Sequence, residues 1–125
     1  MGLFNGIIGN ASEVDINKLA QDYDKLLGPS ERIEKAYKLI RDMIIFTNKR
    51  LIIVDKQGVT GKKTEYRSVP YRAITNFSVE TAGHFDLDAE LKIYISGMSM
   101  PIEKTFSSGC NIYEVQAILA EYCSK

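Results

Sequence analysis

The sequence has few of the residues that usually carry catalytic or metal-binding chemistry. Its 125 residues include one histidine, two cysteines and no tryptophan. A nucleophile and its base would have to pair His84 with Ser107, Ser108 or Cys110, and no local signature supports such a pair. We therefore expect a protein that is not an enzyme and that holds no metal ion and no cofactor.

The two cysteines, Cys110 and Cys123, bracket a segment that we predict to be a single helix. At about 1.5 Å per residue their α-carbons would lie roughly 20 Å apart, whereas a disulfide requires less than about 7 Å. Free thiols are typical of a reducing compartment. No apolar run reaches the length of about 20 residues that spans a bilayer, and the first residues lack the features of a secretory signal. We expect a cytoplasmic location.

Basic and acidic residues are equal in number, sixteen of each, so the formal net charge is zero. This balance argues against a nucleic-acid partner, which bulk positive charge would attract. The charges are nevertheless separated along the chain. Residues 41–72 contain eight basic and three acidic residues, a sum of +5, and residues 73–90 contain four acidic and no basic ones, a sum of −4. The sequence therefore predicts two surfaces of opposite sign.

The first regular element that the sequence predicts is an amphipathic helix of about four turns. Ser12 can cap its N-terminus, and Gly28 followed by Pro29 ends it. Apolar residues recur between these limits at helical spacing; they are Ile16, Leu19, Ala20, Tyr23, Leu26 and Leu27.

Short apolar runs rich in β-branched residues replace the helical period after Pro29, with turn signals between them. From residue 85 apolar and polar residues alternate, which indicates a strand with one buried face. The last segment, 112–122, returns to helical spacing behind a potential cap at Asn111. The predicted strands are 32–40, 43–46, 51–54, 63–69, 74–80, 85–95 and 102–106. About seven short strands with regular turns are typical of a sandwich or barrel.

Two segments carry a resemblance to a known family. RDMIIFTNKRLIIVDKQG at residues 41–58 and SVETAGHFDLDAEL at residues 78–91 resemble the bacterial pleckstrin-homology-like proteins. The resemblance implies a mainly β fold, a barrel of about seven antiparallel strands in two near-orthogonal sheets capped by the C-terminal α-helix. We assign residues 1–28 to an N-terminal tail and the extra amphipathic helix, and residues 30–125 to the barrel domain. The resemblance also implies subunits that assemble into ring-like homo-oligomers.

A basic patch is the candidate site for an anionic ligand. Pleckstrin-homology domains of eukaryotes, which the predicted fold resembles, hold phosphoinositides with Lys and Arg around the loop between the first two strands. In this chain that loop is reduced to Arg41 and Asp42, and Lys38, Lys49 and Arg50 are the other candidate members of the patch. A short turn that contains an acid is a poor cradle for several phosphates. Weak attraction to an anionic membrane surface is the alternative.

An acidic strand is the candidate interface for self-association. His84, Asp86, Asp88 and Glu90 alternate, but neighbours in such a set lie about 7 Å apart along a strand and cannot converge on one metal ion. We interpret them as an acidic surface that meets a basic surface of the next subunit, head to tail. The candidate basic residues are Lys62, Lys63, Arg67 and Arg72.

Three functional hypotheses follow from these observations. The leading one is a non-catalytic binding or scaffolding module that forms a ring-like homo-oligomer. The second is a peripheral domain that binds anionic lipid, and the third is a receptor for a small molecule or peptide at the barrel rim. The expected partners are copies of the chain itself, with a protein or a membrane surface as alternatives.

Overall fold

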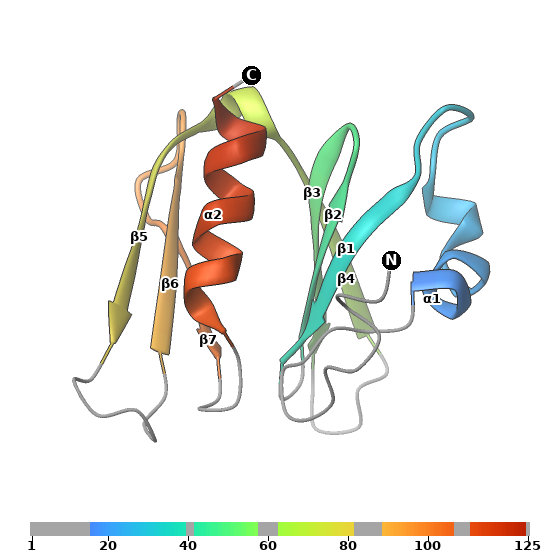
Figure 1. Ribbon diagram of the computed structural model, residues 1–125, viewed down its shortest axis with the longest axis horizontal. Helices are drawn as coiled ribbons and strands as arrows, with labels where there is room; N and C mark the ends of the chain where they lie inside the picture. Colours follow the sequence, from blue (N-terminus) through green and yellow to red (C-terminus); the bar gives the residue numbers. More distant parts are fainter. Residues whose placement is uncertain (1–15, 40–41, 58–62, 82–88, 107–110, 125) are drawn as a thin grey trace.

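Two antiparallel sheets and a C-terminal helix form the core of the protein (Figure 1), as the computed structural model shows. This arrangement confirms the mainly β class and the barrel-like architecture predicted from the sequence. The structure describes residues 16–39, 42–57, 63–81, 89–106 and 111–124.

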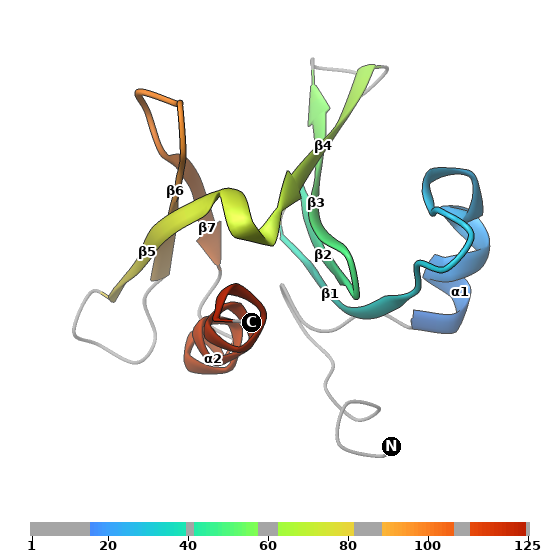
Figure 2. The same cartoon turned by 90° about the horizontal axis from the view of Figure 1, so that it is seen from above.

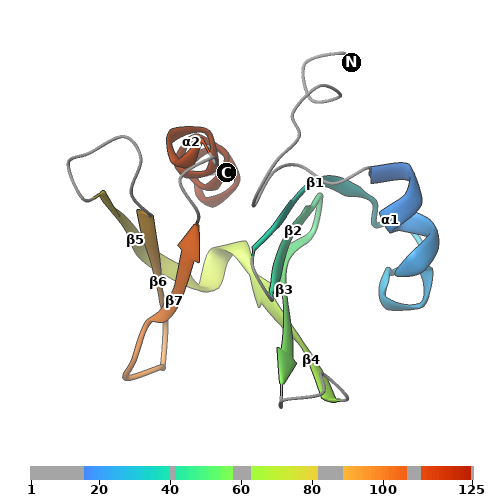
Figure 3. The same ribbon diagram turned by 90° about the horizontal axis from the view of Figure 1, so that it is seen from below.

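The first sheet contains four strands and the second contains three, each in chain order. A short 3₁₀ segment, η3 (Tyr71–Ala73), connects the two sheets at one corner, and the sheets diverge from it on the side away from the C-terminal helix (Figure 3). The strands are β1 (Ile33–Lys38), β2 (Met43–Thr47), β3 (Arg50–Gln57), β4 (Lys63–Pro70), β5 (Ile74–Thr81), β6 (Ala89–Ile95) and β7 (Ile102–Phe106).

The strands β2 and β3 are buried on both faces. Ile44 pairs with Ile53 and points toward the second sheet, whereas the neighbouring pair of Ile45 and Ile52 points to the opposite side of the first sheet. All four side chains are almost inaccessible to water. Continuous apolar runs of this kind, rather than alternating ones, are expected for strands that are covered on both faces.

The helix α1 (Ile16–Asp22) covers the outer face of the first sheet, on the side away from the second sheet (Figure 2). Leu19 is buried there against Ile33, Ala36 and the outer residues of β2 and β3. The N-terminal helix therefore packs on the barrel of its own chain.

The predicted end of this helix, at Gly28, is wrong, because the α-helix ends at Asp22 and a 3₁₀ segment, η2 (Asp24–Leu26), follows. Two tertiary contacts explain the change of geometry. The ring of Tyr23 packs edge-on against Tyr66 of β4, with centroids 5.9 Å apart, and the carbonyl oxygen of Leu26 accepts a hydrogen bond from the Arg50 guanidinium. The predicted cap, Ser12, lies outside the described residues.

The helix α2 (Ile112–Cys123) closes the inner core between the two sheets. Asn111 caps it as predicted, since its side-chain oxygen accepts from the backbone N–H of Glu114 at 3.3 Å. The side chain of Glu114 ties the helix to β1: Oε1 accepts from the Tyr37 hydroxyl at 2.9 Å, and Oε2 lies 3.3 Å from Lys35 Nζ.

The predicted apolar stripe of α2 is confirmed by its burial: Ile112, Val115 and Leu119 are buried, while Ile118 and Tyr122 are half-buried against the core. Strand bounds differ from the prediction by a few residues at most, except that the start of the predicted 85–95 strand, residues 85–88, lies outside the described residues. Its later part alternates as expected, with Ala89, Leu91 and Ile93 buried.

Replacing Leu119 with Ala should reduce the free energy of unfolding by about 2 to 5 kcal/mol, because the side chain is fully buried and the substitution leaves a cavity. Urea unfolding followed by circular dichroism measures this loss. Gln116→Ala is the matched control, because Gln116 is exposed on the same helix and its removal should change stability by no more than about 0.5 kcal/mol. Equal effects of the two variants would contradict the packing described here.

Candidate functional site

The first candidate site is a cleft of about 430 Å³ between the two sheets. Lys104 of β7 crosses it: the Nζ atom lies 2.8 Å from Asp42 Oδ2, just before β2, and 4.0 Å from Asp55 Oδ2 on β3. This ion pair links the second sheet to the first. The cleft is lined by Leu39, Asp42, Asp55, Lys56, Glu103, Lys104 and Thr105.

The charges in this cleft are largely matched within the chain. Burial and the nearby Asp42 carboxylate raise the pKa of Asp55, and the Lys104 ammonium acts in the opposite direction. Because Lys104 is already held by Asp42, it is a poor partner for an external phosphate. Among the described residues, no group of three or more histidine, cysteine or acidic side chains is arranged to hold a metal ion.

A second, smaller cleft of about 240 Å³ lies beside the C-terminal end of α2. Its aromatic part is a pair of stacked rings, Tyr71 and Tyr122, with centroids 4.7 Å apart and planes at 15°. The Tyr71 hydroxyl donates to the carbonyl oxygen of Thr47 at 2.7 Å, and burial is the main cause that raises the pKa of this phenol. The cleft is lined by Asn48, Lys49, Pro70, Tyr71, Arg72, Tyr122 and Cys123.

Lys49 and Arg72 supply the positive charge of this second cleft. Both side chains are exposed, and neither forms an ion pair within the part of the chain that the structure describes. Tyr122 and Cys123 at the end of α2 line the same cleft, so these two cations stand near the negative end of that helix. The last turn of α2 contains no basic residue of its own. Cys123 at the helix end is a free thiol whose pKa is raised by burial, which disfavours the reactive thiolate.

Arg50, a member of the predicted anion-binding patch, is engaged in an ion pair with the nearly buried carboxylate of Glu31. Its guanidinium makes two hydrogen bonds to the Glu31 carboxylate, from Nε at 2.8 Å and from Nη2 at 3.0 Å. Thr47 and the backbone N–H of Gly28 donate to the same carboxylate at 2.6 and 3.0 Å. These donors, the Arg50 bond first among them, lower the pKa of Glu31 to about 2.

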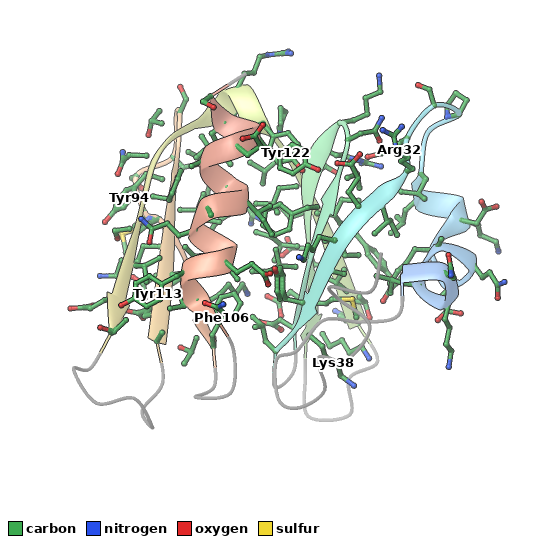
Figure 4. The ribbon with its side chains drawn as sticks, in the orientation of Figure 1. Arg32, Lys38, Tyr94, Phe106, Tyr113 and Tyr122 are labelled. Atoms are coloured by element: carbon green, nitrogen blue, oxygen red, sulfur yellow. The ribbon has the colours of Figure 1, made fainter. Side chains whose placement is uncertain are left out.

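The other members of that patch are not brought together either. Lys38 is paired with Met43 at one end of the β1–β2 ladder, whereas Lys49 lies beyond the other end, where Ile33 faces Thr47. Figure 4 shows Lys38 and Tyr122, which lines the second cleft, at opposite ends of the molecule. The remaining predicted member, Arg41, lies outside the described residues.

Half of the predicted interface residues can be placed. Lys63 and Arg67 lie on β4 and Arg72 lies in η3, whereas Glu90 lies on β6 of the second sheet. Arg67 is already engaged: Nη2 lies 3.7 Å from Glu65 Oε2, and Nη1 lies 3.8 Å from the sulfur of Met98. The other predicted members fall outside the described residues, and these are Lys62, His84, Asp86 and Asp88.

Two arrangements escaped the sequence prediction although a signal for one of them was present. Lys104 alternates with Ile102 and Phe106, so its inward position could have been read from the period of two. The position of Lys49 and Arg72 in one cleft had no such signal in the sequence. It depends on where the corner at η3 lies relative to the β2–β3 turn.

The candidate catalytic residues His84, Ser107, Ser108 and Cys110 all lie outside the described residues. Within the described ranges, no helix has both the length and the apolar character needed to cross a bilayer.

Comparisons with known proteins agree with the fold. A model of the family described as "Bacterial PH domain" matches residues 2–123. The uncharacterized protein YjqA of Bacillus subtilis (strain 168) is 52% identical over 124 residues, which cover 98% of this chain and 99% of YjqA.

Two solved structures are similar over nearly the whole chain. One is a DUF1696 family protein with a pleckstrin-homology domain from Shewanella loihica PV-4, with 52% identity and a TM-score of 0.81, covering 93% of this chain and 99% of the other. The second is a pleckstrin homology domain from Shewanella amazonensis SB2B, with 51% identity and a TM-score of 0.83, covering 98% of each chain.

Replacing Glu31 with Gln should reduce the free energy of unfolding at neutral pH by about 1 to 3 kcal/mol, because the charged hydrogen bonds to Arg50 are weakened in a nearly buried site. The folded-state pKa of Glu31 lies below its ordinary value of 4.5. Its contribution is therefore complete above that value and is lost as the pH falls toward about 2. Urea unfolding at several pH values should show a flatter acid dependence in the variant.

The matched control is Glu34→Gln, because Glu34 forms a more exposed ion pair, 3.1 Å from Arg32. A pair of this kind contributes about 0 to 1 kcal/mol. If both variants lose the same stability and keep the same acid dependence, Glu31 does not have the role assigned to it.

Replacing Lys104 with Met should reduce the free energy of unfolding by about 1 to 3 kcal/mol at neutral pH, because Asp42 and Asp55 lose their shared cation. The loss should shrink as the pH falls, since the raised pKa of Asp55 means that the folded protein takes up a proton more readily than the unfolded chain. Adding Asp55→Asn to Lys104→Met should restore part of the stability, because it removes the repulsion between the Asp42 and Asp55 carboxylates. A double variant less stable than Lys104→Met would refute the proposed repulsion.

Proposed function

The chain belongs to the bacterial PH domain family, and from that premise we propose that it is a non-catalytic binding module that assembles with copies of itself. The observation that carries this proposal is the free edge of β5. A strand edge with unpaired backbone groups is a template for pairing with another chain, and self-pairing is the use that the chemistry of this edge supports best.

The edge strand β5 has few of the side chains that usually prevent pairing. Only β6 lies beside it in the sheet. Among the described residues, no backbone hydrogen bond outside the regular elements involves β5. Its sequence, ITNFSVET, contains no proline and no lysine, and Glu80 is its one charged residue. Proline and lysine are the residues that natural edge strands commonly use to prevent association.

The free edge of β4 is the complementary partner in this proposal. It lies at the end of the first sheet and carries Lys63 and Arg67, with Glu65 between them. Pairing of β4 in one subunit with β5 in the next joins two different surfaces, and a contact of this type closes into a ring or extends as a filament. Opposite charge on the two strands would favour this register and orient the encounter.

The ion pair in the cleft between the sheets favours a surface-based function over a receptor at the barrel rim. Lys104 and Asp42 occupy that cleft with an ion pair between the two sheets. A ligand that binds Lys104 in this cleft would have to displace the ion pair with Asp42. The strand edges require no such rearrangement.

The double substitution Asn76→Lys and Ser78→Lys should lower the mass in solution to that of a monomer. Both residues are exposed on β5, and lysines at an edge oppose pairing, more so against the basic side chains of β4. Size exclusion with light scattering at micromolar concentration measures the mass, and circular dichroism confirms that the fold is retained.

The matched control is Gln116→Lys with Ala120→Lys, which adds the same two charges on the exposed side of α2. The control should keep the mass of the wild type. A wild-type monomer at micromolar concentration, or an oligomer that survives both β5 substitutions, would overturn the proposed function. A dimer that dissociates in the β5 variant would support self-association but exclude a ring.

A further inference from the structure

The second cleft, beside the C-terminal end of α2, takes no part in the pairing of strand edges proposed above. It lies where η3 meets the last turn of that helix, at the top of Figure 1. Its volume is about 240 Å³, which is below the range of about 300 to 1,000 Å³ that is usual for sites of drug-sized ligands. A ligand of this cleft would therefore be a small molecule.

The cleft is positively charged at neutral pH. Lys49 and Arg72 are exposed and form no ion pair within the described residues. None of the described residues that line the cleft is acidic. Burial raises the pKa of the Tyr71 phenol and of the Cys123 thiol, so both groups stay neutral at this pH. An anion that enters the cleft meets two cations and no described lining group of its own sign.

Aromatic rings supply the apolar wall of the cleft. Tyr122 stacks on Tyr71 with centroids 4.7 Å apart, and on Phe46 with centroids 6.1 Å apart. Pro70 is also part of the lining. A flat aromatic ligand packs favourably against such rings in an offset or edge-on geometry. The guanidinium of Arg72 adds a second planar group on which an aromatic ring can stack.

The backbone that carries the two cations is held in place by hydrogen bonds within the chain. The Thr47 hydroxyl accepts from the backbone N–H groups of Lys49 and Arg50 at 3.0 and 2.9 Å. The Tyr71 hydroxyl donates to the carbonyl oxygen of Thr47 at 2.7 Å, which ties η3 with Arg72 to the β2–β3 turn. Because this backbone is already ordered, binding loses little conformational entropy there and more of the interaction energy appears as affinity.

From these observations we propose that the second cleft binds a small aromatic carboxylate. The ring of the ligand packs against Tyr71 and Tyr122, and its carboxylate pairs with Lys49 and Arg72. A guanidinium matches the two oxygens of a carboxylate, which also orients the ligand. This inference does not rest on the self-association proposed above.

An aromatic carboxylate fits the cleft better than inorganic phosphate does. Phosphate has no apolar group, so it would leave the tyrosine rings and Pro70 without a contact. Phosphate sites commonly use the backbone N–H groups at a helix N-terminus, whereas this cleft borders the C-terminal end of α2. The partial negative charge at that end is about half an elementary charge. Lys49 and Arg72 together exceed it and leave a net attraction for a monovalent anion.

Titration of the isotope-labelled full chain with benzoate, followed by nuclear magnetic resonance of its backbone amides, tests the proposal. Signals of residues 48–49, 70–72 and 122–123 should shift in a saturable manner. Benzamide has the ring without the charge, and acetate has the charge without the ring. Each should bind roughly ten-fold more weakly than benzoate, because each lacks one half of the interaction. Inorganic phosphate should also bind more weakly than benzoate.

Removing either cation should weaken the binding of benzoate. Lys49→Gln and Arg72→Gln should each raise its dissociation constant by about five-fold, the effect of losing one surface ion pair. Lys38→Gln with Lys56→Gln is the matched charge control, because both lysines are exposed near the opposite ends of β1 and β3. This control should bind benzoate as the wild type does.

The thiol of Cys123 gives a second measurement, because it lines the cleft. In a Cys110→Ser chain Cys123 is the only cysteine. Benzoate should slow its alkylation by iodoacetamide, whereas acetate and benzamide at the same concentration should have little effect. Adding Lys49→Gln and Arg72→Gln should abolish the protection by benzoate. Thermal unfolding of each variant without ligand shows whether its fold is retained.

Several results would overturn the proposal. One is a wild-type chain whose amide signals do not shift with benzoate; if Lys49→Gln and Arg72→Gln then lower thermal stability, the two cations serve only to offset the negative end of α2. Another is binding of acetate, benzamide or phosphate as tight as that of benzoate. Equal affinity of the cleft variants and the Lys38 and Lys56 control would also contradict it. None of these results bears on the mass in solution that tests self-association.

Discussion

The continuous apolar runs of β2 and β3 impose the constraint on which the rest of the structure depends. Their residues alternate between two faces, and both faces must be covered because both carry large apolar side chains such as Ile44 and Ile45. The second sheet and α2 cover the inner face, and α1 covers the outer one. An isolated barrel without its N-terminal helix would therefore expose an apolar sheet surface, which is a liability for association.

The attachment of α1 explains why Arg50 is engaged within the chain. The segment between η2 and β1 must return to the barrel, and Glu31 fixes it to the β2–β3 hairpin through Arg50 and Thr47. A carboxylate held by this many donors in a nearly buried site keeps its arginine, since separating them would leave the buried Glu31 charge without its partner. The covering of the outer face therefore engages Arg50, whereas Lys49 and Arg72 form no ion pair within the described residues.

The elements of the fold were largely predictable because each depends on local periodicity. Alternation identified the inner face of β6, and the helical stripe of α2 together with Asn111 identified its start and its buried side. The early end of α1 was not predictable, because the ring of Tyr66 and the guanidinium of Arg50 come from distant strands. The sites were harder to predict for the same reason. Lys49 and Arg72 were assigned to different surfaces, and only the tertiary structure at η3 brings them to one cleft.

The distribution of satisfied and unsatisfied charge argues that this domain acts through its exterior. Inside the barrel, Lys104 holds Asp42 across the two sheets and Glu114 holds Tyr37 and Lys35. Each of these pairs joins elements that are distant in sequence, so their removal to admit a ligand would cost packing as well as charge pairing. The pairing proposed at the β5 edge differs in this respect, because it would use the outer edge of the sheet without opening the core. Evolution can alter such surfaces by a few substitutions while the doubly covered sheet stays unchanged.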